Sequence, residues 1–509
     1  MEENRPKLSS IPFVIAGLHF LLHIITNGNY GMFRDEFYYI ACARRLAWGY
    51  VDQPPLSLAV LAGWMRVFGD SVESIRVVPA VAGVISILLT SLIAREMGGR
   101  RFAQAFAALC FAVVPVYLVQ TGLFAMNALD ILFWTLVFYV LVAIVKSGNS
   151  KLWILMGFII GLGLLNKIGV LVLGAGLAVA LILTPGRKYL KSGYLWGAVL
   201  IALVIVLPHV LWQVSNDWPT REFINNAKQF KIAAINPVQY FVGQVVIMHP
   251  AISFVWLLGL GALLGWKRLG PYRILGLIYI VALVIFMVQR SKVYYLSPAY
   301  APLLAAGAVS IERMISRRGL RWVGPVIFIV IAILGAATFP VALPILDPSR
   351  VVGYQQRIGL TPPANEVNDD MGPLPQHFAD RFGWDNMVST IAAVYHGLDA
   401  EERAECVILT GNYGQAAAID YLGPRYGLPG AISGHNNYYL WGPGDKSGEV
   451  AIAYGASHDV LEAVYEEVTE VAVVVSPYAM PWETNQPVFL CRGLKIGLKE
   501  AWRMTKNFI

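Results

Sequence analysis

The stretch RDEFYYIACARRLAWGYVDQPPLSL, residues 34–58, begins a few residues after the first long apolar run of the chain. Two adjacent carboxylates, Asp35 and Glu36, stand beside Arg34 at its start. Charged groups beside a membrane segment are costly, which makes them candidates for a functional site. Asp35 can instead cap the helix that follows. The capping box is incomplete, however, because the third residue on is Tyr38 rather than Glu or Gln.

The composition of the whole chain indicates a membrane protein. Of its 509 residues, 57% are hydrophobic and only 14% are charged, whereas soluble domains have about 45–50% apolar and about 25% charged residues. The net charge of +7 does not require a nucleic-acid partner. The basic residues lie between apolar runs, where membrane topology accounts for them. We expect a polytopic α-helical membrane protein.

Runs of about 17–25 mainly apolar residues can cross a membrane as helices, and we expect about eleven of them. They lie near residues 11–28, 72–94, 102–121, 128–146, 152–165, 168–184, 195–213, 241–265, 274–289, 297–312 and 321–344. The first run has no small-residue cleavage site after it, so we expect it to be retained. Lys and Arg concentrate in alternate loops, which predicts a cytoplasmic N-terminus, an outward C-terminus and a multi-pass protein of the cytoplasmic (inner) membrane.

The chain becomes polar from about residue 346. Short apolar stretches at 406–410, 449–454, 470–476 and 487–491 are typical of buried strands, and the stretches at 413–422 and 458–468 are typical of helices. This alternation predicts a small extracytoplasmic α/β domain at 346–509, after a transmembrane module at 1–345. Cys406 and Cys491 fall on expected strands, where a disulfide or two buried thiols would both fit.

The first outer loop is expected to hold two helices at the membrane interface. The segment at 36–49 is weakly amphipathic, with Arg44 and Arg45 placed to reach lipid headgroups or a phosphate. Pro54 and Pro55 then break the chain. The apolar segment at 56–69 is too short to span and is expected to form the second interfacial helix.

Further polar residues lie at the outer ends of later spans. Asn127 and Asp130 are three residues apart and share a helix face, although they can also serve as helix-start residues. Lys167 lies between two apolar runs. Arg290 and Lys292 precede a pair of tyrosines. Positive residues on the outer side oppose the positive-inside bias and favour an anionic partner such as a lipid phosphate; cations beside an aromatic belt are the alternative.

These pieces together resemble the GT-C membrane glycosyltransferases, most closely the bacterial branch related to protein O-mannosyltransferases and to the lipid A aminoarabinose transferase. The resemblance covers essentially the whole chain. It rests on RDEFYYIACARRLAWGYVDQPPLSL, GLFAMNALDILFW, GLGLLNK, GQVVIMHP and KVYYLSPAYAPLLAAGA. It implies an enzyme that takes a sugar from a polyprenyl-phosphate donor and transfers it, usually with inversion, to an acceptor on the outer side of the membrane.

The resemblance also implies roles for individual residues. Asp35 matches the catalytic Asp, with Glu36 as its neighbour. Asn127 stands where the family commonly has a second Asp. This departure argues against a metal site built from two carboxylates, and the sequence does not decide whether a divalent metal binds. The expected phosphate-binding residues are Arg44, Arg45, Lys167, Arg290 and Lys292, and those near the sugar or the acceptor are Asp52, Gln53, Asn127, Asp130, Tyr294 and Tyr295.

The chemistry is consistent with this reading. The phosphate of a glycosyl-phosphate donor leaves as an anion, so the site needs positive charge beside it. An inverting displacement also needs one base to take the proton of the acceptor. No nucleotide-binding fingerprint occurs in a fitting context. The expected partners are the donor, membrane lipids and a lipid, protein or glycan acceptor. The alternatives are a polyprenyl-lipid transporter or flippase, whose charges would favour the midplane, and a membrane scaffold with a binding domain.

Overall fold

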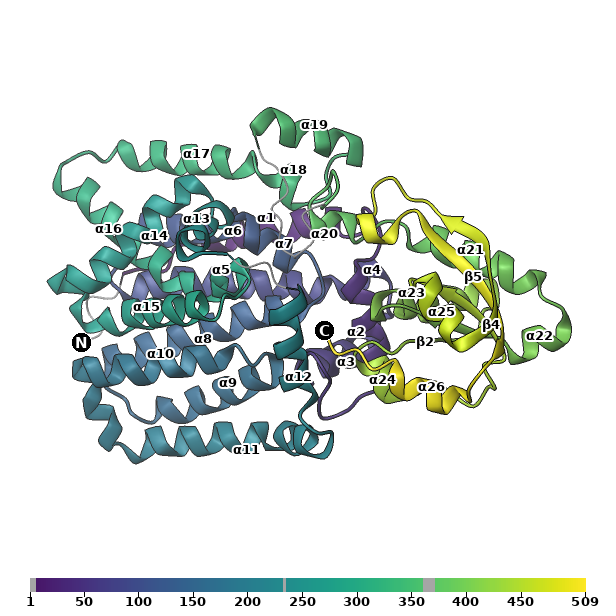
Figure 1. Ribbon diagram of the computed structural model, residues 1–509. Helices are drawn as coiled ribbons and strands as arrows, with labels where there is room; N and C mark the ends of the chain where they lie inside the picture. Colours follow the sequence, from purple (N-terminus) through teal and green to yellow (C-terminus); the bar gives the residue numbers. More distant parts are fainter. Residues whose placement is uncertain (1–5, 232–234, 360–370) are drawn as a thin grey trace.

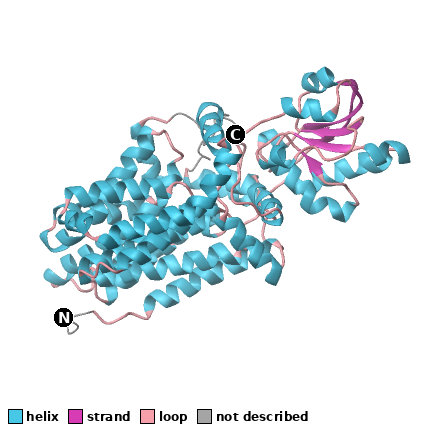
Figure 2. Cartoon of the chain, turned by 90° about the horizontal axis from the view of Figure 1, so that it is seen from below, coloured by secondary structure: helices cyan, strands magenta, loops and turns pink. Residues whose placement is uncertain are grey.

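The computed structural model describes residues 6–231, 235–359 and 371–509. It has a large helical part and, at one end of it, an α/β part (Figure 1). The strands of the described chain all gather at that end, as Figure 2 shows in magenta.

The helical part contains the first eighteen α-helices of the described chain. They are α1 (Ile11–Thr26), α2 (Arg34–Arg44), α3 (Leu56–Phe68), α4 (Val72–Ile75), α5 (Val77–Glu96), α6 (Arg101–Ala112), α7 (Pro115–Thr121), α8 (Met126–Ser147), α9 (Leu152–Asn166), α10 (Val170–Leu183), α11 (Gly193–Ser215), α12 (Pro219–Asn226), α13 (Pro237–Ile247), α14 (Pro250–Gly265), α15 (Arg273–Val288), α16 (Ala301–Arg317), α17 (Val323–Ala336) and α18 (Phe339–Ala342). Shorter helical segments join some of them, namely η1 (Pro185–Lys191), η2 (Ala227–Lys231), η3 (Lys267–Tyr272) and η4 (Val293–Tyr300).

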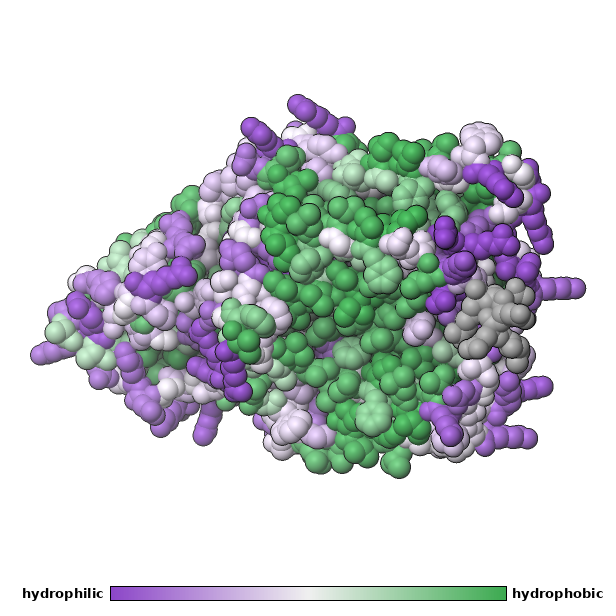
Figure 3. Space-filling model, turned by 180° about the vertical axis from the view of Figure 1, so that it is seen from behind, coloured by the Kyte–Doolittle hydropathy of each residue, from purple (hydrophilic) through white to green (hydrophobic). Residues whose placement is uncertain are grey.

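The surface of the helical part carries a broad apolar band. Figure 3 shows the band in green, with hydrophilic side chains at both ends. Large apolar side chains such as Leu200, Leu203 and Leu207 of α11 are exposed on the outside of the helices. An apolar surface of this size is typical of contact with lipid. The chain is therefore a membrane protein.

Several expected spans are broken. By length and hydropathy, four described helices can cross a membrane, or up to seven if each of three bent pairs is one span. The expected spans at 102–121 and 241–265 are such pairs, bent by 67° between α6 and α7 and by 110° between α13 and α14. The second helices begin at Pro115 and Pro250, because proline starts a helix well but cannot continue one. The expected number of about eleven spans stays a prediction.

Side-chain contacts tie several basic loops together at one end of the helices. Lys146 Nζ lies 2.7 Å from Glu96 Oε2, and the Tyr272 hydroxyl donates to the Glu96 carbonyl at 3.2 Å. The Glu312 carboxylate accepts the backbone N–H of Arg100 at 2.7 Å. The loops after α5 and α8, the segment before α15 and the end of α16 therefore share one end of the helical part.

The α/β part is built on a five-stranded sheet of order β2-β1-β3-β5-β4 in the described residues. Its strands are β1 (Val407–Thr410), β2 (Ala431–Ile432), β3 (Val450–Tyr454), β4 (Tyr465–Val474) and β5 (Gln486–Leu494). The pairs of β1 with β2 and with β3 are parallel, and β5 runs antiparallel to β3 and β4.

The helices of this part are α19 (Pro348–Ile358), α20 (Gln376–Ala379), α21 (Trp384–Gly397), α22 (Ala400–Glu405), α23 (Tyr413–Leu422), α24 (Asn437–Trp441), α25 (His458–Val464) and α26 (Leu498–Met504), with the short turns η5 (Gly423–Tyr426) and η6 (Pro481–Glu483). Residues 360–370 of the expected domain lie outside the described residues. Cys406 and Cys491 are buried free thiols.

One expectation for this part is wrong. The helix expected at 458–468 ends at Val464, and Tyr465 begins β4. The residues after 464 are rich in valine, which favours strands. Their pairing along the whole of β5 outweighs the local helical pattern.

The segment that holds α2 and α3 shares a hydrophobic core with the α/β part. Phe37 of α2 contacts the rings of Trp384 and Tyr421, with centroids 5.9 and 5.6 Å apart. Glu36–Ala43 of α2 are buried throughout. The weak amphipathicity of this segment therefore reflects burial on several sides, and α2 is not the open interfacial helix that we expected.

Candidate active site

A cavity of about 890 Å³ lies where the helical part meets the α/β part. The elements around it are α2, the starts of α8 and η4, the turn between α9 and α10, α12, and the start of α23. Much of its wall is apolar, from side chains such as Val119, Leu171 and Phe286. A cavity with apolar walls and a few polar groups suits a ligand with a long hydrocarbon part and a polar head.

Asp35 lines this cavity from the first turn of α2. The hydroxyl of Tyr413 donates a hydrogen bond to Asp35 Oδ1 at 2.9 Å, and Arg34 Nε lies 3.6 Å from the same oxygen. The Asp35 side chain is 34% exposed. Among the described residues, none donates a hydrogen bond to its Oδ2 atom. One carboxylate oxygen is therefore held, and the other is available to a ligand.

Glu36 points away from the cavity and is fully buried. Arg76 donates to both of its oxygens, from Nε at 2.9 Å and from Nη2 at 2.7 Å. The backbone N–H groups of Phe33 and Phe124 donate to it at 2.9 and 2.8 Å. The structure thus does not bring Glu36 and Asp35 into one site.

The same contacts correct the capping interpretation. Helix α2 begins at Arg34, so Glu36 occupies its third position, from which a carboxylate reaches back to the N–H of the cap residue Phe33. Asp35 makes no such contact and is not the cap.

Lys167 brings the predicted polar residues of two other loops together. Its Nζ donates to Asn127 Oδ1 at 2.8 Å and lies 3.4 Å from Asp130 Oδ2. Asn127 and Asp130 do share a face of α8, as their spacing indicates. Lys167 Nζ also lies 4.8 Å from the centre of the Tyr295 ring and 5.9 Å from that of Tyr294. All five residues line the cavity, as does Lys292.

Asp52 lines the cavity beside Tyr38. The hydroxyl of Tyr38 donates to Asp52 Oδ1 at 3.1 Å, and it also lies 3.2 Å from Asn437 Oδ1 of the α/β part. Burial, with the charge of Asp52, raises the pKa of the Tyr38 hydroxyl well above its usual range. Tyr38 therefore stays protonated and holds the Asp52 carboxylate in place.

Besides Glu36, four more predicted site residues lie outside the cavity wall. Arg44 pairs with Asp70 at 2.7 Å, and the Arg45 guanidinium lies 4.3 Å from the centre of the Trp441 ring. Gln53 is buried next to the wall, and Arg290 is exposed at the end of α15. The structure does not bring these four side chains to the group around Lys167.

Sequence reasoning missed the most direct partner of Asp35, the tyrosine at position 413. The sequence feature that could have indicated Tyr413 is the strand-to-helix turn in ILTGNYGQ. Tyr413 is the first residue of α23 and follows β1, a strand with a parallel neighbour on each side. Ligands of α/β sheets bind at the carboxyl ends of such strands.

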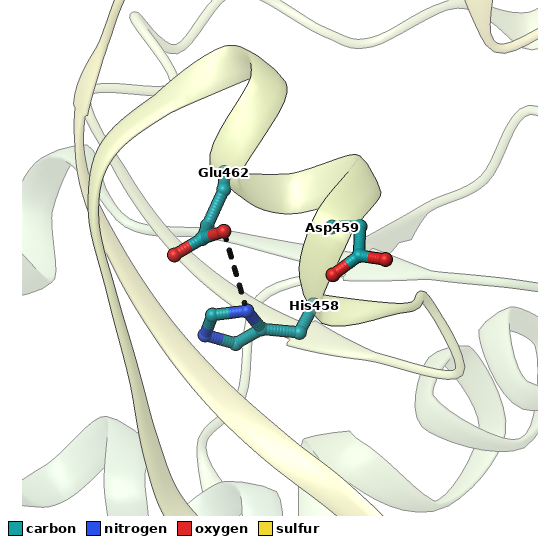
Figure 4. Close-up of side chains that lie close together, drawn as sticks. All are labelled: His458, Asp459 and Glu462. Atoms are coloured by element: carbon teal, nitrogen blue, oxygen red, sulfur yellow. Dashed lines mark ion pairs between the residues drawn. The ribbon is translucent and has the colours of Figure 1, made fainter.

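In the described part of the chain, the carboxylates at the cavity do not gather into a metal site. A group of three potential ligands within 4.8 Å of one another occurs instead at His458, Asp459 and Glu462. Figure 4 shows this group on α25, where His458 Nδ1 lies 3.6 Å from Glu462 Oε2. All three are exposed. At the cavity, Asp130 lies against Lys167 and Asp35 against Arg34.

Comparisons with known proteins agree on the fold. The structure superposes on ArnT from Cupriavidus metallidurans, solved bound to undecaprenyl phosphate, with a TM-score of 0.61 and 16% identity, over 94% of this chain and 97% of the other. The chain has the GT-C fold. Residues 52–212 also match the family model described as dolichyl-phosphate-mannose-protein mannosyltransferase. The resemblance inferred from the sequence is confirmed.

Two curated relatives are similar over part of their length. The lipid A galacturonosyltransferase RgtD of Rhizobium johnstonii is 22% identical over 44% of this chain and 48% of its own. The undecaprenyl phosphate-alpha-4-amino-4-deoxy-L-arabinose arabinosyl transferase 1 of Pseudomonas fluorescens is 24% identical over 59% of each. The matches thus span about half the length of these relatives.

Proposed function

We propose that this protein is a glycosyltransferase that moves a sugar from a polyprenyl-phosphate-linked donor to an acceptor at the extracytoplasmic face of the membrane. The observation that carries the proposal is the single cavity that Asp35 and Lys167 both line, with apolar walls beside them. The carboxylate can take a proton, the ammonium can bind a phosphate, and the apolar wall can take a polyprenyl chain. The names of the relatives support this choice of donor and a lipid A-type acceptor.

The reaction follows from the two oxygens of Asp35. The acceptor hydroxyl gives its proton to Oδ2, and its oxygen forms a bond to the anomeric carbon of the sugar. The bond between that carbon and the phosphate oxygen breaks, and the polyprenyl phosphate leaves with the electron pair. Lys167 and Lys292 offset the phosphate charge. Attack from the face opposite the phosphate inverts the anomeric centre.

The membrane arrangement is part of the proposal. The loops around Glu96, Lys146 and Glu312 face the cytoplasm, and the cavity and the α/β part face outward in the cytoplasmic (inner) membrane. The module at 1–345 supplies the donor site, and the domain at 346–509 helps to select the acceptor.

The test is sugar transfer by the purified full-length protein in detergent or liposomes, with undecaprenyl-phosphate sugars as donors and lipid A as acceptor. Asp35→Asn should lower turnover by at least about a hundredfold, as expected for loss of a general base, while binding of undecaprenyl phosphate is retained. Full transfer by Asp35→Asn would contradict the base assignment. Lipid translocation without any transfer would favour the flippase alternative.

A second pair of variants tests the phosphate site. Lys167→Met should weaken binding of undecaprenyl phosphate about tenfold or more, because a charge-assisted contact is lost. The matched control is Lys188→Met. Its ammonium also lies over a tyrosine ring, that of Tyr189 at 5.0 Å, but it belongs to η1 and does not line the cavity. Equal effects of the two substitutions would argue against a phosphate at Lys167.

A further inference from the structure

Tyr413 belongs to the α/β part, yet it lines the cavity and is 7% exposed. Its hydroxyl donates to Asp35 Oδ1 at 2.9 Å, a contact between residues 378 positions apart in the chain. Burial, with the nearby charge of Asp35, raises the pKa of Tyr413 well above its usual range. The hydroxyl therefore keeps its proton and acts as a donor to the carboxylate.

The backbone at Tyr413 is fixed by a capping box. Asn412 Oδ1 accepts the N–H of Gln415 at 3.0 Å, and Gln415 Oε1 accepts the N–H of Asn412 at 3.3 Å. The amide groups of both side chains then donate to the buried Glu483, at 2.9 and 2.8 Å. These contacts engage both side chains of the turn, so the first residue of α23 has little freedom.

The ring of Tyr413 packs against two other aromatic rings. Its ring lies 4.5 Å from the ring of Tyr38 and 4.9 Å from that of His435, between centroids. The next residue, Gly414, lies so close to α2 that an added Cβ would collide with the Arg34 side chain. The start of α23 is therefore docked directly on the turn that carries Asp35.

We propose that Tyr413 is a positioning residue for the Asp35 base, so that the α/β domain completes the catalytic centre of the membrane module. This inference rests on the proposed function. The Tyr413 hydroxyl fixes the rotamer of the carboxylate through Oδ1 and leaves Oδ2 to face the acceptor hydroxyl.

The decisive variant is Tyr413→Phe in the full-length protein, because it removes the hydroxyl and keeps the ring that contacts Tyr38 and His435. We expect kcat to fall about tenfold, because a carboxylate that is free to rotate is less often in position to take the proton. The KM for the donor should stay within about twofold, since the phosphate contacts are intact.

Tyr438→Phe is the matched control in the same domain. This buried tyrosine also donates to a carboxylate, Asp420 Oδ2 at 2.7 Å, but it does not line the cavity. The substitution should lower the melting temperature and leave kcat and the donor KM unchanged.

Three outcomes decide the inference. A lower kcat at an unchanged donor KM in Tyr413→Phe alone supports it. A wild-type kcat in Tyr413→Phe, with Asp35→Asn inactive in the same preparation, overturns the positioning role and leaves the proposed function standing. Full activity of Asp35→Asn would overturn the base assignment and this inference with it.

Discussion

Asp35 and Glu36 are neighbours in the chain with opposite environments. One lines a cavity and keeps an oxygen available, whereas the other is enclosed by Arg76 and two backbone N–H groups. The first turn of α2 separates them, because consecutive side chains of a helix point about 100° apart. Substitution of each carboxylate should therefore have a different measurable effect.

Glu36→Gln is expected to destabilise the protein and Asp35→Asn to leave its stability nearly unchanged. The new side-chain amide in Glu36→Gln would turn a donor toward Arg76, and breaking a buried ion pair costs about 3–5 kcal/mol. Thermal unfolding of the two detergent-solubilised variants measures this difference. A Glu36→Gln protein that melts at the wild-type temperature would contradict the structural role.

Part of the site could be predicted from single residues and their spacing. Asp35 and Lys167 are charges at membrane edges, and the i, i+3 spacing of Asn127 and Asp130 fixes a common face. The residue at which a helix starts is harder to predict. The candidate cap in the sequence is Asp35, but the cap is Phe33, and this shift of two residues makes Glu36 the carboxylate that reaches the cap. Tyr413 was out of reach, because the chain alone does not show which distant loop docks on α2.

At the scale of elements, α14 and α16 cross at two glycines. A Cβ at Gly259 would collide with the carbonyl oxygen of Leu303, and one at Gly307 with that of Val255. Small residues allow such close helix contact in membranes. These two helices position the cavity wall, since η4 leads directly into α16.

Gly259→Ala should therefore lower stability, because the helices must separate to admit one methyl group. We expect a loss of about 1–3 kcal/mol, the range for overpacking, read as a lower melting temperature and a smaller monodisperse fraction. Gly261→Ala is the control on the same helix, where an added Cβ meets nothing within 4 Å. Equal melting temperatures for the two variants would refute this account of the crossing.

Element prediction from the sequence was accurate for apolar runs and poor at their breaks. Hydropathy identified the stretches around α6–α7 and α13–α14, but it could not show that Pro115 and Pro250 turn each into a bent pair. Likewise β4 is a strand because it pairs with β5 along its length. Both outcomes depend on neighbours that a local pattern does not contain.

At the scale of the whole molecule, the composition changes clearly at the expected boundary of 345/346, but the side-chain packing continues across it. The segment that holds α2 and α3 contributes Phe37, Ile40 and Leu58 to the same buried cluster as Ile408 and Ile419 of the α/β part. Composition separates an apolar segment from a polar one, but it does not show which loop a later domain will cover. The cavity lies at this junction, so neither part contains it alone.

The orientation of this assembly in the membrane gives the last prediction. A cysteine placed at Glu470, exposed on β4, should react with a membrane-impermeant maleimide in spheroplasts of an expressing bacterium. A cysteine placed at the exposed Lys188 of η1 should react only after the membrane is permeabilised, because the basic loops face the cytoplasm.

The background in this experiment should be low. All four native cysteines are buried, and burial raises the pKa of Cys406 to about 11 and that of Cys491 to about 12. At about pH 7 few of these two thiols are in the reactive thiolate form. Labelling of Lys188→Cys before permeabilisation, with Glu470→Cys protected, would invert the orientation. It would place the cavity, Asp35 and the proposed transfer reaction on the cytoplasmic side.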